Sequence, residues 1–161
     1  MSERIVTNPV QMSANWRVAM SGLANLFLTM HRNFSAPMGL GPTELLIYVT
    51  IAVANVQKLM RERCIPPVHS GTEILPREWV VPISRNAIAS ATGLPRETVR
   101  RHVARMIASG LLIEDARGGV TTAIGMIQDQ GLEPLLAALL AEFTRTTEGL
   151  LRGGVIEIQP A

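Results

Sequence analysis

Apolar residues recur at intervals of three and four along two long stretches of the chain. These stretches are residues 10–31 and residues 129–151. Such spacing places apolar side chains along one face of a helix with 3.6 residues per turn, so each stretch predicts an amphipathic α-helix. The apolar face is wide in both cases, and we therefore expect both helices to need a packing partner.

Between these helices, apolar segments alternate with segments that contain several prolines. Residues 42–63 are apolar nearly all round through their middle and predict a helix in the centre of the core. Residues 33–42 and 65–77 predict connecting loops. Residues 79–81 predict a short strand, which Pro82 ends. The first half of the chain is therefore expected to be mostly helical.

Residues 83–122 carry a more specific order of signals. A short helical segment, residues 85–92, leads into Gly93, and a second helix is expected over residues 95–110. A β-hairpin should follow, turning at residues 117–119. Helix, turn, helix and hairpin in this order predict a helix-turn-helix with a wing.

The spacing inside this segment has a steric reason. Ala89 lies four residues before Gly93, and Val99 lies six residues after it. Two helices that cross closely need a small residue where they touch, backbone freedom at the turn and a β-branched residue in the crevice. On a helical wheel, Val99 shares one face with Val103 and Met106, and this face is predicted to pack inward.

The net charge of the chain is only +2, but its positive charge is concentrated in this segment. Between residues 85 and 117, six arginines accompany three acidic residues. Four of these arginines lie on the second predicted helix, a density that suits a polyanion such as DNA. They are Arg96, Arg100, Arg101 and Arg105.

The second helix of a helix-turn-helix places its first turn in the major groove. We therefore expect Arg96, Glu97 and Thr98 to read base edges, with Arg101 next. Arginine can donate two hydrogen bonds to guanine, and glutamate can accept one from cytosine.

The remaining arginines are expected to contact the DNA backbone. Arg100 and Arg105 should hold phosphates, which fixes the position of the protein without reading sequence. Arg117, at the tip of the predicted hairpin, should contact the backbone or enter the minor groove.

Residues 89–112, ASATGLPRETVRRHVARMIASGLL, resemble the winged helix-turn-helix of bacterial transcription regulators, particularly the GntR type. The likeness lies in the small turn residues followed by arginine, threonine, valine and arginine. It implies DNA contacts by Arg96, Thr98 and Arg100. Pro95 stands where that family usually has serine or threonine, so the usual side-chain cap is missing.

The apolar helices on either side of the motif resemble the MarR type, in which such helices build a homodimer. The loop at residues 65–77 departs from that pattern, and no large effector domain of the GntR kind follows the motif. The resemblances imply a mainly α fold with a small β-hairpin wing and dimerisation helices on both sides. The expected domains are residues 1–41, 42–127 and 128–161. A hydrophobic content of 47% with only 17% charged residues also favours self-association.

These features predict a sequence-specific transcription regulator, a repressor rather than an activator, that binds a pseudo-palindromic operator of double-stranded DNA as a homodimer. The alternative is a winged-helix protein-interaction module that binds an acidic protein partner. No enzyme activity and no cofactor are expected. The eight methionines leave open a small apolar effector near the dimer helices, although core packing explains them more simply.

Cys64 and His69 form a remote alternative, a thiol hydrolase, but two prolines lie between them and no third member or oxyanion donor is evident. The cysteine and the histidines are not spaced as metal ligands, so no metal site is expected. The histidines are His31, His69 and His102.

The sequence also predicts a cytoplasmic location. The longest apolar run, residues 45–56, is too short to cross a hydrocarbon core of roughly 30 Å, so no membrane contact is expected. The first ten residues lack the apolar segment of a secretory signal. A single cysteine, Cys64, fits a reducing compartment.

Overall fold

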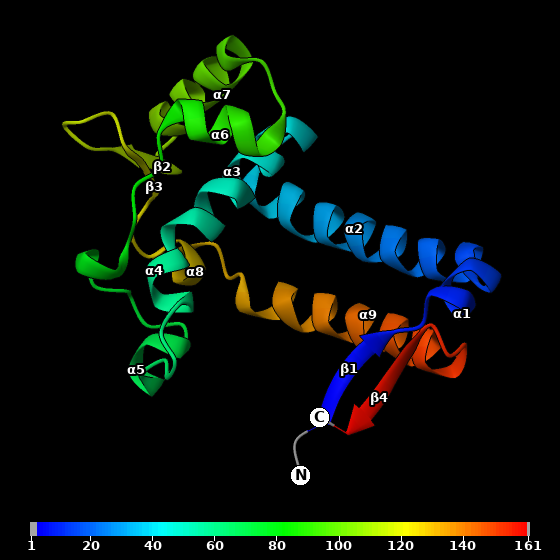
Figure 1. The fold of residues 1–161 in the computed structure, drawn as a ribbon. Helices are drawn as coiled ribbons and strands as arrows, with labels where there is room; N and C mark the ends of the chain where they lie inside the picture. The colour runs from blue at the N-terminus through cyan, green and yellow to red at the C-terminus, as the bar shows by residue number, and fades with distance from the viewer. Residues whose placement is uncertain (1–2, 161) are drawn as a thin grey trace. The chain divides into compact units, whose positions relative to one another are not determined.

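The computed structural model describes residues 3–160, which are mainly helical with two small antiparallel sheets (Figure 1). The chain forms two compact units. The terminal unit contains the chain up to Phe34 and from Pro134 onward, and the central unit is Ser35–Glu133. The expected mainly α fold with a small β-hairpin is confirmed.

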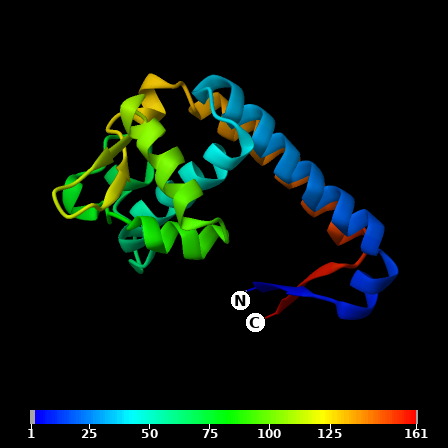
Figure 2. The same cartoon turned by 90° about the horizontal axis from the view of Figure 1, so that it is seen from above.

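The terminal unit joins segments that lie far apart in the sequence. Its elements are β1 (Glu3–Thr7), α1 (Pro9–Ala14), α2 (Trp16–Met38), α9 (Glu133–Arg152) and β4 (Ile156–Pro160). β1 pairs antiparallel with β4, with Glu3 opposite Pro160 and Thr7 opposite Ile156. α2 and α9 run side by side in opposite directions (Figures 1 and 2).

The helix predicted for residues 10–31 is in fact two helices, α1 and α2. Asn15 separates them, because its backbone leaves the helical conformation with φ of −112° and ψ of 25°. Its side-chain amide donates to the carbonyls of Gln11 at 3.1 Å and Gly153 at 3.2 Å. The second of these bonds links the break to the segment that follows α9.

The connector predicted at residues 33–42 is wrong over most of its length. α2 continues to Met38 and includes Pro37 in its last turn. Gly39 ends the helix with φ of 63°, and the N–H of Leu40 donates to the carbonyl of Ser35 at 2.9 Å. This left-handed glycine cap stops the helix later than the proline suggested.

The helix predicted over residues 129–151 begins later, at Glu133, as α9, and the short α8 (Met126–Asp129) precedes it. Gly131, with φ of 57°, lies between α8 and α9. After α9 the chain forms β4, which pairs with a strand that the sequence did not predict. β1 was missed because five residues with polar side chains at three positions carry little periodic signal.

α2 and α9 approach closely at Gly22. A Cβ atom at this position would lie 2.8 Å from Cγ2 of Thr146, and the Thr146 hydroxyl donates to the Gly22 carbonyl at 3.3 Å. Thr146 is buried. Glycine at this position therefore sets how near the two helices lie.

The central unit has α3 at its core. Its elements are α3 (Pro42–Asn55), α4 (Gln57–Met60), α5 (Pro67–Ser70), the 3₁₀ helix η1 (Arg77–Trp79), α6 (Arg85–Thr92), α7 (Arg96–Ala108), β2 (Leu112–Glu114), β3 (Val120–Thr122) and α8. Ile47 and Ile51 of α3 are fully buried, as is Ile88 of α6. The inward face predicted for the second motif helix is confirmed, since Val99, Val103 and Met106 are at most 1% exposed.

Two predicted elements of this unit are wrong. The helix expected over residues 42–63 ends at Asn55, with only the short α4 after it. The strand expected over residues 79–81 is absent, because Trp79 belongs to η1. The pairing instead falls on Ile83, which exchanges hydrogen bonds of 3.0 and 2.9 Å with Val120.

The Asn55 side chain links the end of α3 to Val81, before α6, and to Thr122 in β3. Its side-chain amide donates to the carbonyl of Val81 at 2.8 Å, and its side-chain oxygen accepts from the N–H of Thr122 at 2.9 Å. The residue is 2% exposed. Both hydrogen bonds are partly buried, and they satisfy backbone groups of the two segments that flank α3. Asn55 thereby fixes β3 and the segment before α6 against α3.

Candidate nucleic-acid interface

α6 and α7 are joined by a short turn with a defined backbone. Gly93 ends α6 with φ of 70°, and its N–H donates to the carbonyl of Ala89 at 2.9 Å. The Thr92 hydroxyl donates to the Ile88 carbonyl at 2.8 Å and accepts from the N–H of Leu94 at 3.3 Å. The glycine is needed here because a side chain rarely adopts this conformation. The turn fixes the start of α7.

The hairpin of β2 and β3 has an ordered tip. The Asp115 side chain accepts from the N–H groups of Arg117 and Gly119, both at 2.8 Å. A Cβ atom on Gly119 would lie 2.7 Å from both an Asp115 oxygen and Pro82, so no larger residue fits. The tip therefore presents Arg117 on a braced loop, and the Arg117 side chain is exposed.

Arg85, in the first turn of α6, holds the hairpin from its side. Its guanidinium donates to both carboxylate oxygens of Glu114 at 2.6 and 2.9 Å, and to the Gly118 carbonyl at 3.5 Å. The hydrogen bond from Arg85 lowers the pKa of Glu114 below its usual value. Arg85 counted toward the basic surplus of the sequence, but its charge is used within the fold.

The predicted contact residues on α7 are in different surroundings. Arg96 and Arg101 are exposed, and neither is part of an ion pair within the described part of the chain. Thr98 is half-buried in the first turn of α7. Both arginines lie away from the inward face of α7, which Val99, Val103 and Met106 form.

Glu97 and Arg100 pair with each other. The Arg100 guanidinium donates to the two carboxylate oxygens of Glu97 at 2.8 and 2.6 Å. This hydrogen bonding lowers the pKa of Glu97 and raises that of Arg100. Both side chains are largely exposed, so water and salt weaken the pair. Each remains able to exchange its partner for a DNA group.

Arg105 is held by another helix. Its Nη2 lies 2.8 Å from Oε1 of Glu44 in α3 and 2.6 Å from Nδ1 of His102. No sequence pattern indicated this cluster, because Glu44 lies in a different helix and no local spacing relates it to α7. The expected phosphate-binding role of Arg105 therefore has an intramolecular competitor.

The two residues of the thiol hydrolase alternative lie after α4, Cys64 in a loop and His69 in α5. Cys64 is exposed, and the His69 ring lies 5.8 Å from that of Trp79. The Lys58 ammonium lies 5.0 Å from the same indole ring. Within residues 3–160 no three side chains of the metal-binding types cluster as a metal site would require.

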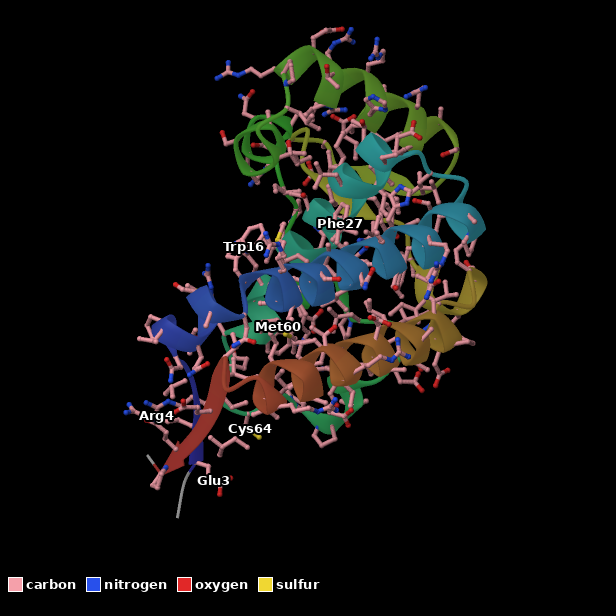
Figure 3. The ribbon with its side chains drawn as sticks, turned by 90° about the vertical axis from the view of Figure 1, so that its right-hand side faces the viewer. Glu3, Arg4, Trp16, Phe27, Met60 and Cys64 are labelled. Atoms are coloured by element: carbon pink, nitrogen blue, oxygen red, sulfur yellow. The ribbon has the colours of Figure 1, made fainter. Side chains whose placement is uncertain are left out.

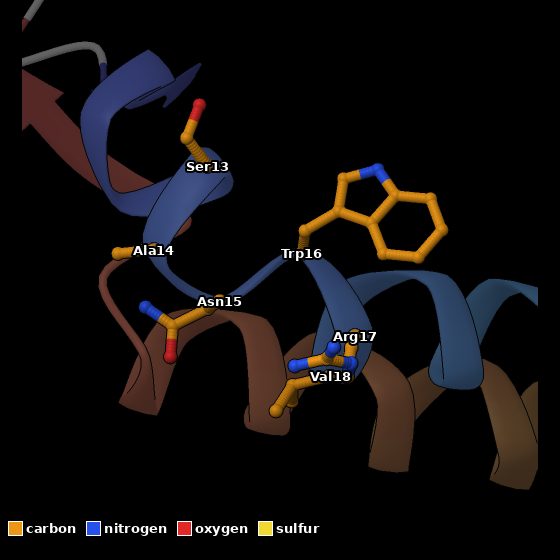
Figure 4. Close-up of a pocket in the computed structure, with 6 residues that line it drawn as sticks. All are labelled: Ser13, Ala14, Asn15, Trp16, Arg17 and Val18. Carbon is orange, nitrogen blue, oxygen red and sulfur yellow. The ribbon is translucent and has the colours of Figure 1, made fainter.

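The α1–α2 junction carries a shallow open hollow, which residues 13–18 line (Figure 4). Asn15 points from it toward the segment after α9, whereas the Trp16 indole stands clear of the helices (Figure 4). This hollow lies in the terminal unit and includes none of the residues predicted to contact DNA.

The terminal unit exposes an unusual amount of apolar surface. Ala19 and Val155 are the buried hydrophobic residues among its described positions. Large apolar side chains form stripes at helical spacing along α2 and α9, each 50–60% exposed; Figure 3 labels Trp16 and Phe27 among them. The stripes consist of Trp16, Met20, Leu23 and Phe27 on α2, and Leu136, Leu140 and Phe143 on α9.

No helix in the described part of the chain is, by itself, both long enough and apolar enough to cross a membrane. Comparison of the chain with known protein families, with curated proteins and with solved structures gave no match.

Proposed function

We propose that residues 83–122 form a winged helix-turn-helix and that the protein is a sequence-specific, DNA-binding transcription regulator. The observation that carries the proposal is that three exposed arginines form no ion pair within residues 3–160 and lie on elements held in place by hydrogen bonds. Arg96 and Arg101 project from α7, whose start is fixed by Gly93, and Arg117 projects from a hairpin held by Arg85. Cations on rigid elements lose little freedom when they bind a polyanion.

Within this proposal the residues have distinct roles. The first turn of α7 reads base edges in the major groove through Arg96, Glu97 and Thr98, with Arg101 beside them. Release of Arg100 from Glu97 frees both for DNA, the arginine for a phosphate and the carboxylate for a cytosine amino group.

Arg117 serves the backbone or the minor groove from the hairpin tip. Asp115 supports this role, since it holds the backbone on both sides of the tip glycine, Gly118. Arg105 serves a phosphate when it leaves Glu44.

We further propose that the protein acts as a homodimer through the apolar stripes of α2 and α9. A large side chain has an area of roughly 150–250 Å². Seven such side chains at about half exposure present on the order of 700 Å², close to the roughly 800 Å² that each partner buries in a standard interface. A two-fold dimer would present two copies of α7 to a pseudo-palindromic operator, and bound there it would act as a repressor.

Selection of bound duplexes from a random pool tests the DNA-binding proposal. We expect a recovered motif with two-fold symmetry. Arg96→Ala and Arg101→Ala should each weaken binding by about 1–3 kcal/mol, because a bidentate base contact is worth that much. Arg61→Ala removes an equal charge from an exposed position outside the motif and should have little effect.

Two outcomes would overturn this reading. If no duplex binds even at low salt, the proposal fails. If the α7 variants bind duplex DNA as tightly as Arg61→Ala, α7 is not the contacting helix. Binding of an acidic polypeptide in place of DNA would favour a protein-interaction module instead.

Sedimentation equilibrium tests the dimer. Phe27→Glu and Leu140→Glu should each convert the protein to a monomer, because they place a charge in the proposed interface. Val68→Glu is the matched control, since Val68 is 61% exposed in the central unit. Loss of association in all three variants, or in none, would contradict the assignment.

A further inference from the structure

Glu44 lies in the first turn of α3 and gathers three partners. One carboxylate oxygen, Oε2, accepts from the Gly41 N–H at 3.1 Å. The other, Oε1, forms an ion pair with Arg105, whose Nη2 lies 2.8 Å away, and it lies 3.3 Å from Nδ1 of His102. The carboxylate is only 18% exposed and the His102 side chain 12% exposed, whereas Arg105 is 58% exposed. Glu44 is thus fixed while Arg105 stays accessible.

The same geometry assigns the proton of His102. Nη2 of Arg105 lies 2.6 Å from Nδ1 of His102, and a guanidinium can only donate hydrogen bonds. Nδ1 therefore acts as the acceptor, and the ring carries its proton on Nε2. Arg105 is consequently held within its own protein by an ion pair with a carboxylate and a hydrogen bond to an imidazole nitrogen.

The charge state of Glu44 fits this arrangement. Burial favours the neutral acid and raises its pKa, but the hydrogen bond from the Gly41 N–H and the positive charge of Arg105 act in the opposite direction. The pKa of Glu44 accordingly lies below its usual value. The carboxylate is ionised at neutral pH and can mimic a phosphate oxygen toward Arg105.

We infer that Glu44 competes with DNA phosphates for Arg105 and thereby lowers the affinity of the protein for DNA of any sequence. This inference rests on the proposed function. Phosphate binding removes Arg105 from Glu44, which keeps the Gly41 N–H. A proton on Nδ1 of His102 would then face Glu44 in place of the guanidinium.

The competition affects all DNA sequences alike, because phosphate contacts carry no sequence information. A regulator that withholds one phosphate-binding arginine binds random DNA less tightly, while its base contacts are unchanged. The Glu97–Arg100 pair has less of this effect, since both of its side chains are more than 60% exposed and exchange freely with solvent. Glu44 therefore sets the overall affinity for DNA from outside the contact surface.

Glu44→Gln is the informative variant, because glutamine keeps the shape and the acceptor for Gly41 but loses the charge. We expect it to tighten binding to a random-sequence duplex about fivefold at low salt, the effect of releasing one partly shielded ion pair. The NMR signals of the Arg105 guanidinium should exchange faster in the variant without DNA. Glu78→Gln, an exposed position that changes the net charge equally, should leave the affinity unchanged.

A double-mutant cycle separates competition from general electrostatics. In an Arg105→Ala background, Glu44→Gln should have no further effect on affinity, because the arginine that it releases is gone. If the gain persists in that background, or if Glu78→Gln produces the same gain, Glu44 does not act through Arg105. Absence of duplex binding by the wild-type protein would instead refute the proposed function, and the inference with it.

Discussion

The close approach of α2 and α9 at Gly22 can be tested with two glycine substitutions in the same unit. Alanine in place of a helical glycine normally stabilises a protein by about 0.5–1 kcal/mol. Gly149, in α9, has open space around the position of a Cβ atom. Gly149→Ala should therefore show that gain. At Gly22 the added Cβ would lie 2.8 Å from Cγ2 of Thr146, whereas carbon atoms at rest lie roughly 3.5–4.0 Å apart.

The contact at Gly22 must therefore be relieved by a shift of the helices or of Thr146, which is buried and has little room. Overpacking of this kind costs about 1–3 kcal/mol. After subtraction of the helical gain, Gly22→Ala should destabilise the protein by about 1 kcal/mol, and the two alanine variants should differ by about 2 kcal/mol. Serine at position 146 removes the clashing methyl group but keeps the hydroxyl that donates to Gly22.

Urea unfolding at one fixed protein concentration measures these differences, since any self-association makes the midpoint depend on concentration. Combining Gly22→Ala with Thr146→Ser should restore most of the lost free energy of unfolding. Thr146→Ser alone should not increase the free energy of unfolding. If both glycine variants stabilise the protein equally, or if Thr146→Ser fails to rescue Gly22→Ala, the helices do not pack at this point as described.

Three further outcomes are expected in the central unit. Asn55→Ala should lower the free energy of unfolding by about 2–4 kcal/mol, measured by urea denaturation, because Val81 and Thr122 each lose a partly buried hydrogen bond to a buried side chain; Asn86→Ala, at an exposed position, should cost less than about 0.5 kcal/mol. Burial raises the pKa of Tyr48, the single tyrosine, to about 12, so phenolate absorbance should appear well above pH 10; an ordinary titration would contradict its burial. Because the folded-state pKa of Tyr48 exceeds the unfolded value of about 10, the contribution of the neutral phenol to the free energy of unfolding is complete below pH 10. This contribution declines between pH 10 and 12. Arg85→Ala should speed amide exchange at Gly118, whereas exchange at Val99 in α7 should not change; protection of Gly118 as in the wild type would show that Arg85 does not hold the hairpin.

Local patterns predicted the parts of the fold that depend on local spacing. The inward face of α7 followed from the positions of Val99, Val103 and Met106, and the turn followed from Gly93. The break at Asn15 was not predictable in this way, because one of its bonds reaches Gly153 across 138 positions of sequence. The strand expected near Trp79 failed for a similar reason, since pairing with Val120 selected Ile83 instead.

The same difference between local spacing and long-range contacts applies to the residues of the candidate interface. Arg96 and Arg101 are exposed, as expected for residues outside the inward face that the helical wheel defines. The wheel could not distinguish Arg105 from them, because its partner Glu44 is supplied by α3. Likewise, Arg85 resembled the other cations in a charge count, yet tertiary structure pairs it with Glu114.

The terminal unit is built from both ends of the chain, and this determines the order in which parts of the protein can fold. Asn8 donates to Glu157 at 2.7 Å across 149 positions of sequence, and β1 cannot pair until β4 has been synthesised. Ser35–Glu133 is complete well before that and can fold while the ribosome is still translating α9. During this interval the face of α2 that contacts α9 at Gly22 has no partner. The last helix of the chain is therefore needed before α2 can complete its packing.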